Sequence, residues 1–259
     1  MTTSRRYARR LSPPRVDYER HGPGYARHRR SDPRIAARIH AALGDARTVL
    51  NVGAGAGSYE PRDRWVLAVE PSAAMRTQRP PDAAPAIDAR AEALPFDDDA
   101  VDAAMACVTI HHWEPPQAGL RELRRVARGA VVVFTFDLEA LPAWQKDYLA
   151  DGLAIERPRF PTMEAIAAAL GGRTHVEHIP TPADCVDGFF EAYWRRPEAL
   201  LDPVARANIS VFALMDDAEE AALLARLEDD LRSGAWAERN ADILALDALD
   251  VGCRILVAW

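Results

Sequence analysis

The sequence predicts an α/β fold of the doubly wound, Rossmann-like type. Short apolar segments alternate with segments of helical periodicity along most of the 259 residues, a pattern typical of a parallel sheet covered by helices on both faces. A turn of small residues, Gly53–Gly57, directly follows one apolar segment, and an acid, Glu70, ends the next. Because the carboxyl ends of parallel strands meet at one edge of a sheet, we expect the turn and the acid to form a nucleoside site there.

The elements follow from apolar periodicity and from the residues that begin and end them. Asp32 and Pro33 suit the N-cap and first position of a helix that ends near Gly44. The glycines at 171 and 172 similarly end a later helix. The predicted strands span 48–52, 65–69, 86–88, 101–107, 130–136, 175–179 and 253–259, with helices at 33–43, from about 72, at 116–127 and at 162–172.

About 70 residues separate the last two predicted strands. They include the amphipathic segment 218–234, and they are too apolar for a linker, so we expect a helical insertion at about 183–250. It either covers the open end of the sheet as a lid or forms a purely structural appendage.

Composition and charge exclude several classes of protein. The chain is 49% hydrophobic, but no apolar run approaches the roughly 18–20 residues that a membrane span needs, which favours a cytoplasmic protein without membrane contact. Cys107, Cys185 and Cys253 are scattered, which predicts neither disulfides nor a metal site. The acidic run Asp97–Asp99 is expected to be a solvated turn, because consecutive carboxylates point in different directions and a metal needs converging ones.

Charge is distributed unevenly along the chain. Residues 1–40 hold eleven arginines against three acids, whereas the whole chain has a net charge of −7. We therefore predict a basic, disordered tail at 1–16 ahead of an acidic body. An acidic body argues against nucleic acid as a partner, although the basic tail leaves RNA open as an alternative. The sequence does not define an oligomeric state.

The glycine turn differs from a dinucleotide site. The fingerprint G-x-G-x-x-G requires glycine where Ser58 stands, which disfavours NAD. The run Val49–Tyr59 instead resembles motif I of the class I S-adenosylmethionine-dependent methyltransferases, and Glu70 matches that family's ribose-binding acid. The segment Ala89–Trp113 and the later ELRRV, Glu122–Val126, also resemble the small-molecule, type 11-like members.

This resemblance implies a single methyltransferase domain over 17–259, with an N-terminal lid at 17–44 that includes Tyr18. It implies a mostly parallel, seven-stranded sheet whose last two strands are antiparallel, with the helical insertion before the last strand. It also implies S-adenosyl-L-methionine as the cofactor. The residues expected to bind this cofactor are Tyr25, Arg29, Asn51, Gly53, Ala54, Gly55, Glu70, Pro71, Ala91, Glu92 and Cys107.

The chain departs from the family pattern at two places. Asn51 stands where the family usually has an acid, so it can form hydrogen bonds but cannot supply charge near the sulfonium. A Pro-Gly-Gly turn before the fifth strand is replaced by Ala127, Arg128 and Gly129.

Candidate catalytic residues follow the fourth predicted strand. His111 and then His112 are the candidates for a general base, which methyl transfer needs only if the acceptor must lose a proton. Alternatively, one of them packs against the next helix. Trp113, Phe189, Tyr193 and Trp194 are candidates to bind the acceptor, although the spacing of the last three suits core packing equally well.

The function predicted from these residues is methyl transfer to a small organic acceptor, plausibly in specialised metabolism. Two alternatives stay open. One is an RNA methyltransferase that uses the basic arm, and the other is a non-catalytic nucleoside-binding module.

Overall fold

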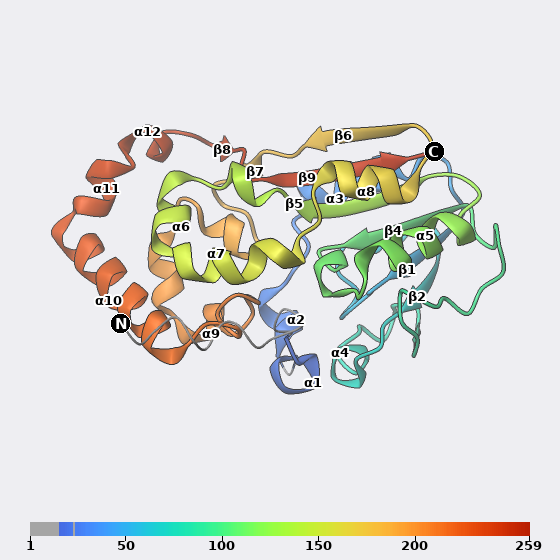
Figure 1. Cartoon of the computed structure of the whole chain (residues 1–259), viewed down its shortest axis with the longest axis horizontal. Helices are drawn as coiled ribbons and strands as arrows, with labels where there is room; N and C mark the ends of the chain where they lie inside the picture. Colours follow the sequence, from blue (N-terminus) through green and yellow to red (C-terminus); the bar gives the residue numbers. More distant parts are fainter. Residues whose placement is uncertain (1–15, 23) are drawn as a thin grey trace.

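The computed structural model describes residues 16–22 and 24–259. The predicted basic tail at 1–16 therefore lies outside the described residues, apart from Val16. Seven strands form one sheet in the order β3-β2-β1-β4-β5-β9-β6 (Figure 1). They are β1 (Thr48–Val52), β2 (Trp65–Val69), β3 (Ala86–Ile87), β4 (Ala103–Cys107), β5 (Val131–Phe136), β6 (Thr174–His178) and β9 (Cys253–Ala258).

The direction of the strands confirms the predicted sheet. The neighbouring pairs from β3 to β5 are parallel, whereas β9 lies antiparallel to both β5 and β6. The sheet is thus mostly parallel, with its antiparallel strand contributed by the last segment of the chain.

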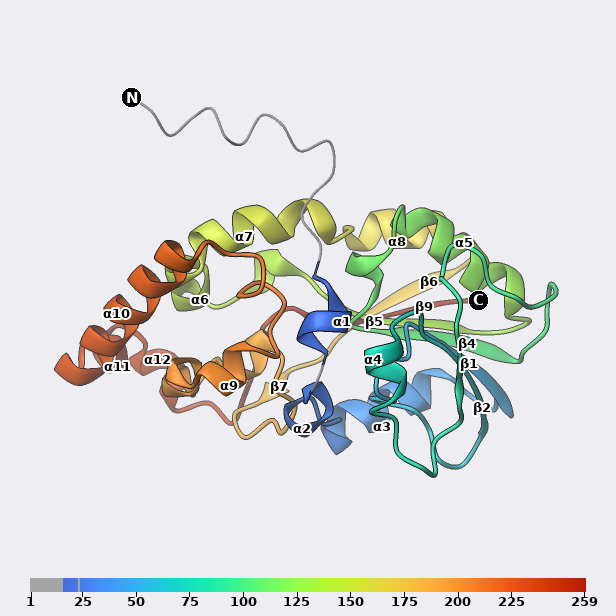
Figure 2. The same cartoon turned by 90° about the horizontal axis from the view of Figure 1, so that it is seen from below.

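Helices cover both faces of the sheet (Figure 2). Successive side chains of a strand point to opposite faces, and β4 illustrates this, since Met105 packs on one apolar cluster and Ala106 on the other. The first cluster includes α3 (Pro33–Ala42), and the second includes α5 (Pro116–Val126) and α8 (Met163–Leu170). Burial on both faces explains why the central strands β4, β5 and β9 are apolar along most of their length.

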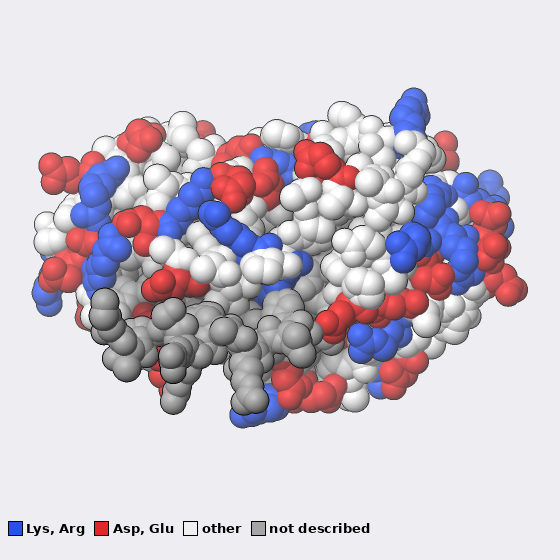
Figure 3. All heavy atoms as spheres, in the orientation of Figure 1, with Lys and Arg blue, Asp and Glu red and all other residues white. Residues whose placement is uncertain are grey.

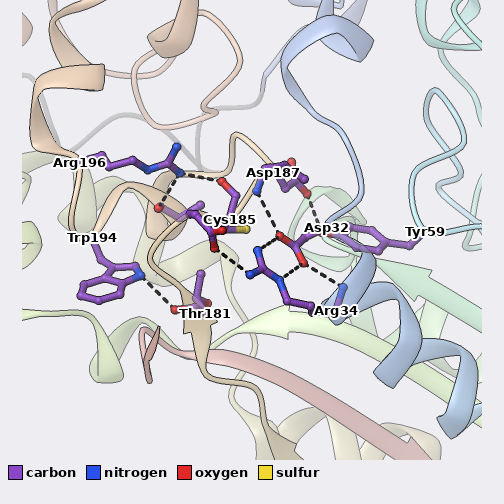
Figure 4. A network of polar contacts seen from close by, with 11 residues as sticks. Asp32, Arg34, Tyr59, Thr181, Cys185, Asp187, Trp194 and Arg196 are labelled. Atoms are coloured by element: carbon purple, nitrogen blue, oxygen red, sulfur yellow. Dashed lines mark hydrogen bonds and ion pairs between the residues drawn. The ribbon is translucent and has the colours of Figure 1, made fainter. Parts of the chain in front are cut away.

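The first predicted helix forms as expected. The Asp32 carboxylate accepts a hydrogen bond from the backbone N–H of Arg34 at 2.9 Å, which caps α3. Its second oxygen accepts from the backbone N–H of Val186 at 3.2 Å, and Arg34 also pairs with Asp184 (Figure 4). The start of α3 is therefore joined to the segment that opens the predicted insertion.

A second lobe lies beside the carboxyl ends of the parallel strands (Figure 1). Its upstream part, between β5 and β6, consists of α6 (Ala143–Tyr148) and α7 (Ala150–Glu156), neither of which was predicted. Its downstream part is the predicted helical insertion. This holds the 3₁₀ turns η5 (Phe190–Tyr193) and η6 (Pro197–Leu201), the helices α9 (Pro203–Arg206), α10 (Asp217–Ser233), α11 (Ala235–Arg239) and α12 (Ala241–Leu244), and the two-stranded sheet of β7 (Thr181–Pro182) and β8 (Ala248–Leu249).

Short elements complete the chain near the carboxyl ends of the strands. The N-terminal segment forms α1 and α2, which lie near the middle of the molecule in Figure 2. These elements are α1 (Tyr18–His21), α2 (Tyr25–His28), α4 (Ala73–Arg76), η2 (Ile110–His112), η3 (Leu138–Ala140) and η4 (Arg157–Arg159).

The face of the molecule seen in Figure 3 has no single dominant charge among the described residues. On the face in Figure 3, acidic and basic side chains are intermixed over both lobes. Within 16–22 and 24–259, no helix combines the length and apolarity that crossing a bilayer requires.

Candidate active site

A cavity of about 220 Å³ lies where β1, β2 and β4 end. All eleven residues that the sequence assigns to cofactor binding line it, together with His112 and Trp113. Residues spread from the N-terminal segment to the loop after β4 thus converge on one space, as expected for the carboxyl edge of a parallel sheet.

The glycine turn after β1 forms the floor of this cavity. Gly53 has φ of 68°, and a Cβ there would lie 2.1 Å from the Thr109 hydroxyl oxygen. Only glycine tolerates both the left-handed backbone and this approach. The turn is not followed by a helix before β2, so no long helix dipole points at the cavity from this turn.

Glu70 is fixed at the end of β2 by two backbone amides. One carboxylate oxygen accepts from the N–H of Gly55 and the other from the N–H of Ser72, both at 2.8 Å. Burial raises the pKa of this carboxyl, while the two amides, Arg76 and Arg79 act in the opposite direction. Each carboxylate oxygen keeps a further lone pair, which a pair of ribose hydroxyls can use.

Asn51 brings an unpaired acceptor to the same cavity. Its side-chain nitrogen donates to Glu60 at 3.0 Å, but its buried Oδ1 atom has no hydrogen-bond partner among the described residues. Arg79 holds both oxygens of Glu60, at 2.9 and 2.8 Å, and neutralises that charge. Acceptors at Asn51 and Glu70 therefore fit a nucleoside that carries an ammonium group, as S-adenosylmethionine does.

Arg29 joins the N-terminal segment to the second lobe. Its Nε atom donates to Asp187 at 2.7 Å and its Nη1 atom donates to the Tyr25 hydroxyl at 2.6 Å. The other Asp187 oxygen accepts from the Tyr59 hydroxyl at 2.7 Å, a contact visible in Figure 4. Burial opposes the charge of Arg29, but Asp187 outweighs it and raises the pKa of the guanidinium. The predicted pairing with a cofactor carboxylate is thus left to the two hydrogens of Nη2 and the second hydrogen of Nη1.

A smaller cavity of about 50 Å³ adjoins the first and shares Arg29 and Val108 with it. Leucine, phenylalanine, isoleucine and valine side chains make most of its wall, and Phe189 is among them. Val108 adopts φ of 52°, which is uncommon for a β-branched residue and frequent at functional sites. Polar groups also reach this wall, from His111, Glu156, Glu191 and Ser210.

Neither ring nitrogen of His112 is free to accept a hydrogen bond or a proton. Its Nδ1 atom lies 2.9 Å from Arg159, which can only donate, so the proton of the neutral ring resides on Nε2 and faces the Tyr18 hydroxyl at 2.9 Å. Burial, then the charges of Arg159 and Arg29, lower the pKa of His112 to about 3. This geometry argues against the predicted role of His112 as a general base.

His111 is placed differently. Its ring stacks on Phe160, with centroids 4.2 Å apart and planes 11° apart, and it borders the smaller cavity. Its Nδ1 atom is buried without a hydrogen-bond partner in the described chain. Burial, followed by the effect of His112, lowers the pKa of His111 well below its usual value, so the ring is neutral.

The three aromatic residues of the insertion separate in the structure. Phe189 lines the smaller cavity, whereas Tyr193 and Trp194 line neither cavity. Trp194 is fully buried, and its indole N–H donates to the backbone oxygen of Thr181 at 3.1 Å (Figure 4). The expectation that Trp194 lines an acceptor pocket is therefore corrected to a core role. Trp113 does reach the larger cavity, because Gly119 of α5 leaves room for its ring.

Sequence reasoning missed several polar residues of the site, among them Tyr59 and Asp187. It also missed Glu156 and Arg159, which form a buried ion pair at 3.0 Å. Their spacing of three residues next to an apolar stretch was a usable signal. Glu191 carried no such signal, since it lies in a run of aromatic residues. The described residues contain no group of His, Cys, Asp and Glu side chains that could hold a metal.

Comparisons with known proteins identify the family of this chain. A family model described as a methyltransferase domain matches residues 50–134. A solved structure from Anabaena variabilis ATCC 29413, described as a methyltransferase from an antibiotic biosynthesis pathway, is 30% identical with a TM-score of 0.81, over 90% of this chain and 99% of that chain.

More distant structures share the fold. Phosphoethanolamine N-methyltransferase 2 of Haemonchus contortus, solved with S-adenosyl-L-methionine, is 14% identical with a TM-score of 0.53, over 86% of this chain and 51% of that chain. No curated protein matches the sequence. The match to the methyltransferase domain and the relative of nearly equal length show that this chain belongs to the class I S-adenosylmethionine-dependent methyltransferases.

Proposed function

We propose that this methyltransferase acts on a small organic acceptor that binds in the smaller cavity, in a pathway of specialised metabolism. The observation that carries the proposal is the pair of adjoining cavities, which share Arg29 and Val108. The larger one offers acceptors for a nucleoside, and the smaller one is enclosed by apolar side chains. The Anabaena variabilis relative, described as part of an antibiotic biosynthesis pathway, supports the assignment to specialised metabolism.

The roles of the residues follow from their positions. Glu70 holds the ribose, Asn51 accepts from the ammonium group, and Ala91 with Glu92 borders the base. Bound S-adenosylmethionine supplies a methyl group on a positively charged sulfur. The chain contributes orientation and exclusion of water, which together provide most of the acceleration in such a transfer. His111 accepts a proton where the acceptor must lose one.

The two alternatives receive less support. Tail residues 1–15, on which an RNA methyltransferase would depend, lie outside the described residues, and the surface of Figure 3 shows no extended basic face. A non-catalytic binding module would account for the larger cavity but not for the second one beside it.

The assignment of Glu70 is tested by Glu70→Ala. Loss of a charge-assisted pair of hydrogen bonds to the ribose is expected to weaken S-adenosylhomocysteine binding by about 2–3 kcal/mol, roughly 30- to 150-fold. Isothermal titration calorimetry measures this, with the exposed Glu228→Ala on α10 as the matched control. Glu70→Gln keeps the size of the side chain and checks that the loss does not arise from misfolding. Equal affinity in all three variants would reject the ribose role.

A further inference from the structure

We infer that the acceptor is an amine with an apolar body, bound as its ammonium ion in the smaller cavity with the Glu191 carboxylate as its counter-ion. To take the methyl group, the bound ammonium would first give one proton to the unpaired Nδ1 atom of His111, which leaves its nitrogen with the lone pair that forms the new N–C bond. This inference rests on the proposed function and specifies its substrate class. Three observations support it: the way the charges around the cavity are paired, the polar atoms that have no partner there, and the apolar side chains of the wall.

The charges bordering the cavity balance except for one. Arg29 is paired with Asp187 at 2.7 Å, and Arg159, next to the cavity, is paired with Glu156 at 3.0 Å. Glu191 is 5% exposed and lines the cavity, yet no side chain among the described residues forms an ion pair or hydrogen bond with it. The ionised form of Glu191 would therefore be the single uncompensated charge, which one cationic nitrogen would complement.

The unpaired atoms around the cavity are acceptors. The Oε2 atom of Glu156 is buried without a partner, and so is the Nδ1 atom of His111, which accepts when the ring proton is on Nε2. The Ser210 hydroxyl donates its hydrogen to the other oxygen of Glu156 at 3.1 Å. An ammonium group only donates and has up to three hydrogens, so it matches Glu191, Glu156 and His111. A carboxylate ligand would find neither the Oε2 atom of Glu156 nor the Nδ1 atom of His111 complementary.

The rest of the wall defines the body of the ligand. Leu138, Leu153, Phe160, Phe189 and Ile209 all border the cavity. Such side chains gain free energy from apolar contact and offer no hydrogen bonds to a polar body. A sugar or a nucleotide therefore does not fit, whereas an alkyl or aromatic group does.

Binding of an ammonium ion beside Glu191 is expected to release a proton. Burial is the main cause that raises the pKa of Glu191 to about 8, opposed by its own backbone N–H and by Arg29, while Glu156 and Asp187 act in the same direction as burial. The Cys253 thiol on β9 also faces Glu191, and burial keeps this thiol neutral by raising its pKa. At pH 7 the free carboxyl thus holds its proton, and an ammonium ligand must displace it. Amine affinity is expected to rise with pH up to about 8.

Calorimetry with the full-length protein saturated with S-adenosylhomocysteine tests the inference. Benzylamine, which is a cation at neutral pH, is compared with benzyl alcohol and benzoate, which share its ring and its size. We expect benzylamine to bind about tenfold more tightly than either, because a hydrogen bond to a charged group contributes more than a neutral one. Titrations in buffers of different ionisation heat should show close to one proton released per benzylamine bound at pH 7.

Glu191→Gln is the decisive variant. Glutamine matches the neutral carboxyl in size and charge, so the fold should persist, as its melting temperature would show. We expect benzylamine to lose about tenfold in affinity and proton release to vanish, while benzyl alcohol and S-adenosylhomocysteine bind as before. The exposed Glu198→Gln, seven residues further along the chain, is the matched control.

Two kinds of failure are distinguishable. If S-adenosylhomocysteine binds but benzyl alcohol or benzoate equals benzylamine, or if Glu191→Gln leaves benzylamine binding unchanged, the amine assignment is overturned and the methyltransferase function stands. If S-adenosylhomocysteine itself produces no heat and no shift in melting temperature, the proposed function and the inference fall together.

Discussion

His111 and His112 are adjacent in the sequence, but their neighbours give them different chemistry. Arg159 occupies the acceptor nitrogen of His112, whereas a buried nitrogen of His111 has no partner and its ring borders the smaller cavity. The sequence placed both rings at the right edge of the sheet. It ranked His111 ahead of His112, but it could not show why the two rings differ, because Arg159 comes from a turn 47 residues further along the chain.

Substitution of each histidine tests this difference. We expect His111→Asn to lower turnover by about 100-fold or more if the acceptor loses a proton, with little change in cofactor affinity. His112→Asn should lower turnover less, because its amide oxygen can still accept from Arg159. Turnover is measured with labelled S-adenosylmethionine and an acceptor found by screening. If neither variant loses turnover, positioning alone drives the reaction and no proton transfer by these rings is needed.

Among the elements, those with regular periodicity were predictable and those with interruptions were not. The predicted strands at 48–52 and 65–69 match β1 and β2, and the antiparallel placement implied for the last strand matches β9. Helices α6 and α7 were missed because they are short and the second contains Gly152, which lowers helix propensity. Tertiary contacts support them instead, such as the hydrogen bond from the Trp144 indole to the Trp194 backbone oxygen at 2.9 Å.

Helix α3 depends on a single buried cap. Burial alone would raise the pKa of Asp32, but hydrogen bonds from the Arg34 side chain and from two backbone amides outweigh it and lower the pKa to about 2. The folded-state pKa is thus below the unfolded one. The stabilisation from this carboxylate is present above the unfolded pKa and is lost as pH falls through about 2.

Asp32→Ala is expected to lower the free energy of unfolding by about 2–3 kcal/mol, because it removes the cap and leaves the amide of Val186 without its partner. Denaturant unfolding at pH 7 measures the loss. Asp184→Ala removes the exposed partner of the same Arg34 and should cost much less, because solvent screens this ion pair. The difference in the free energy of unfolding between Asp32→Ala and the parent protein should become smaller towards pH 2. A constant gap would show that the lowered pKa of Asp32 does not contribute.

At the scale of the whole molecule, the RNA alternative depends on the basic tail, whereas the small-molecule proposal depends on the acidic body. The sequence locates the charge asymmetry, but the described residues include nothing before Val16. Every residue to which our proposal gives a role lies after position 16, within the part of the chain that the structure describes.

Deletion of residues 1–15 distinguishes the small-molecule proposal from the RNA alternative. We expect the shortened protein to bind S-adenosylhomocysteine and to methylate a small acceptor as the full chain does, because all residues to which we assign a role in binding or transfer remain present. An RNA methyltransferase would instead lose affinity for RNA, most clearly at low salt where basic residues contribute most. Filter binding with RNA at two salt concentrations, alongside calorimetry, measures both. Loss of small-molecule turnover in the shortened protein would contradict our proposal.

Arg29 borders both cavities and pairs with Asp187 of the second lobe, so one guanidinium group is in contact with the sites of both ligands. Any change in its position on filling one site alters the free energy of filling the other. Thermodynamic reciprocity then fixes the size of this effect: the factor by which the nucleoside changes affinity for the acceptor equals the factor by which the acceptor changes affinity for the nucleoside. The affinity for S-adenosylhomocysteine after transfer therefore depends on whether the methylated product is still bound.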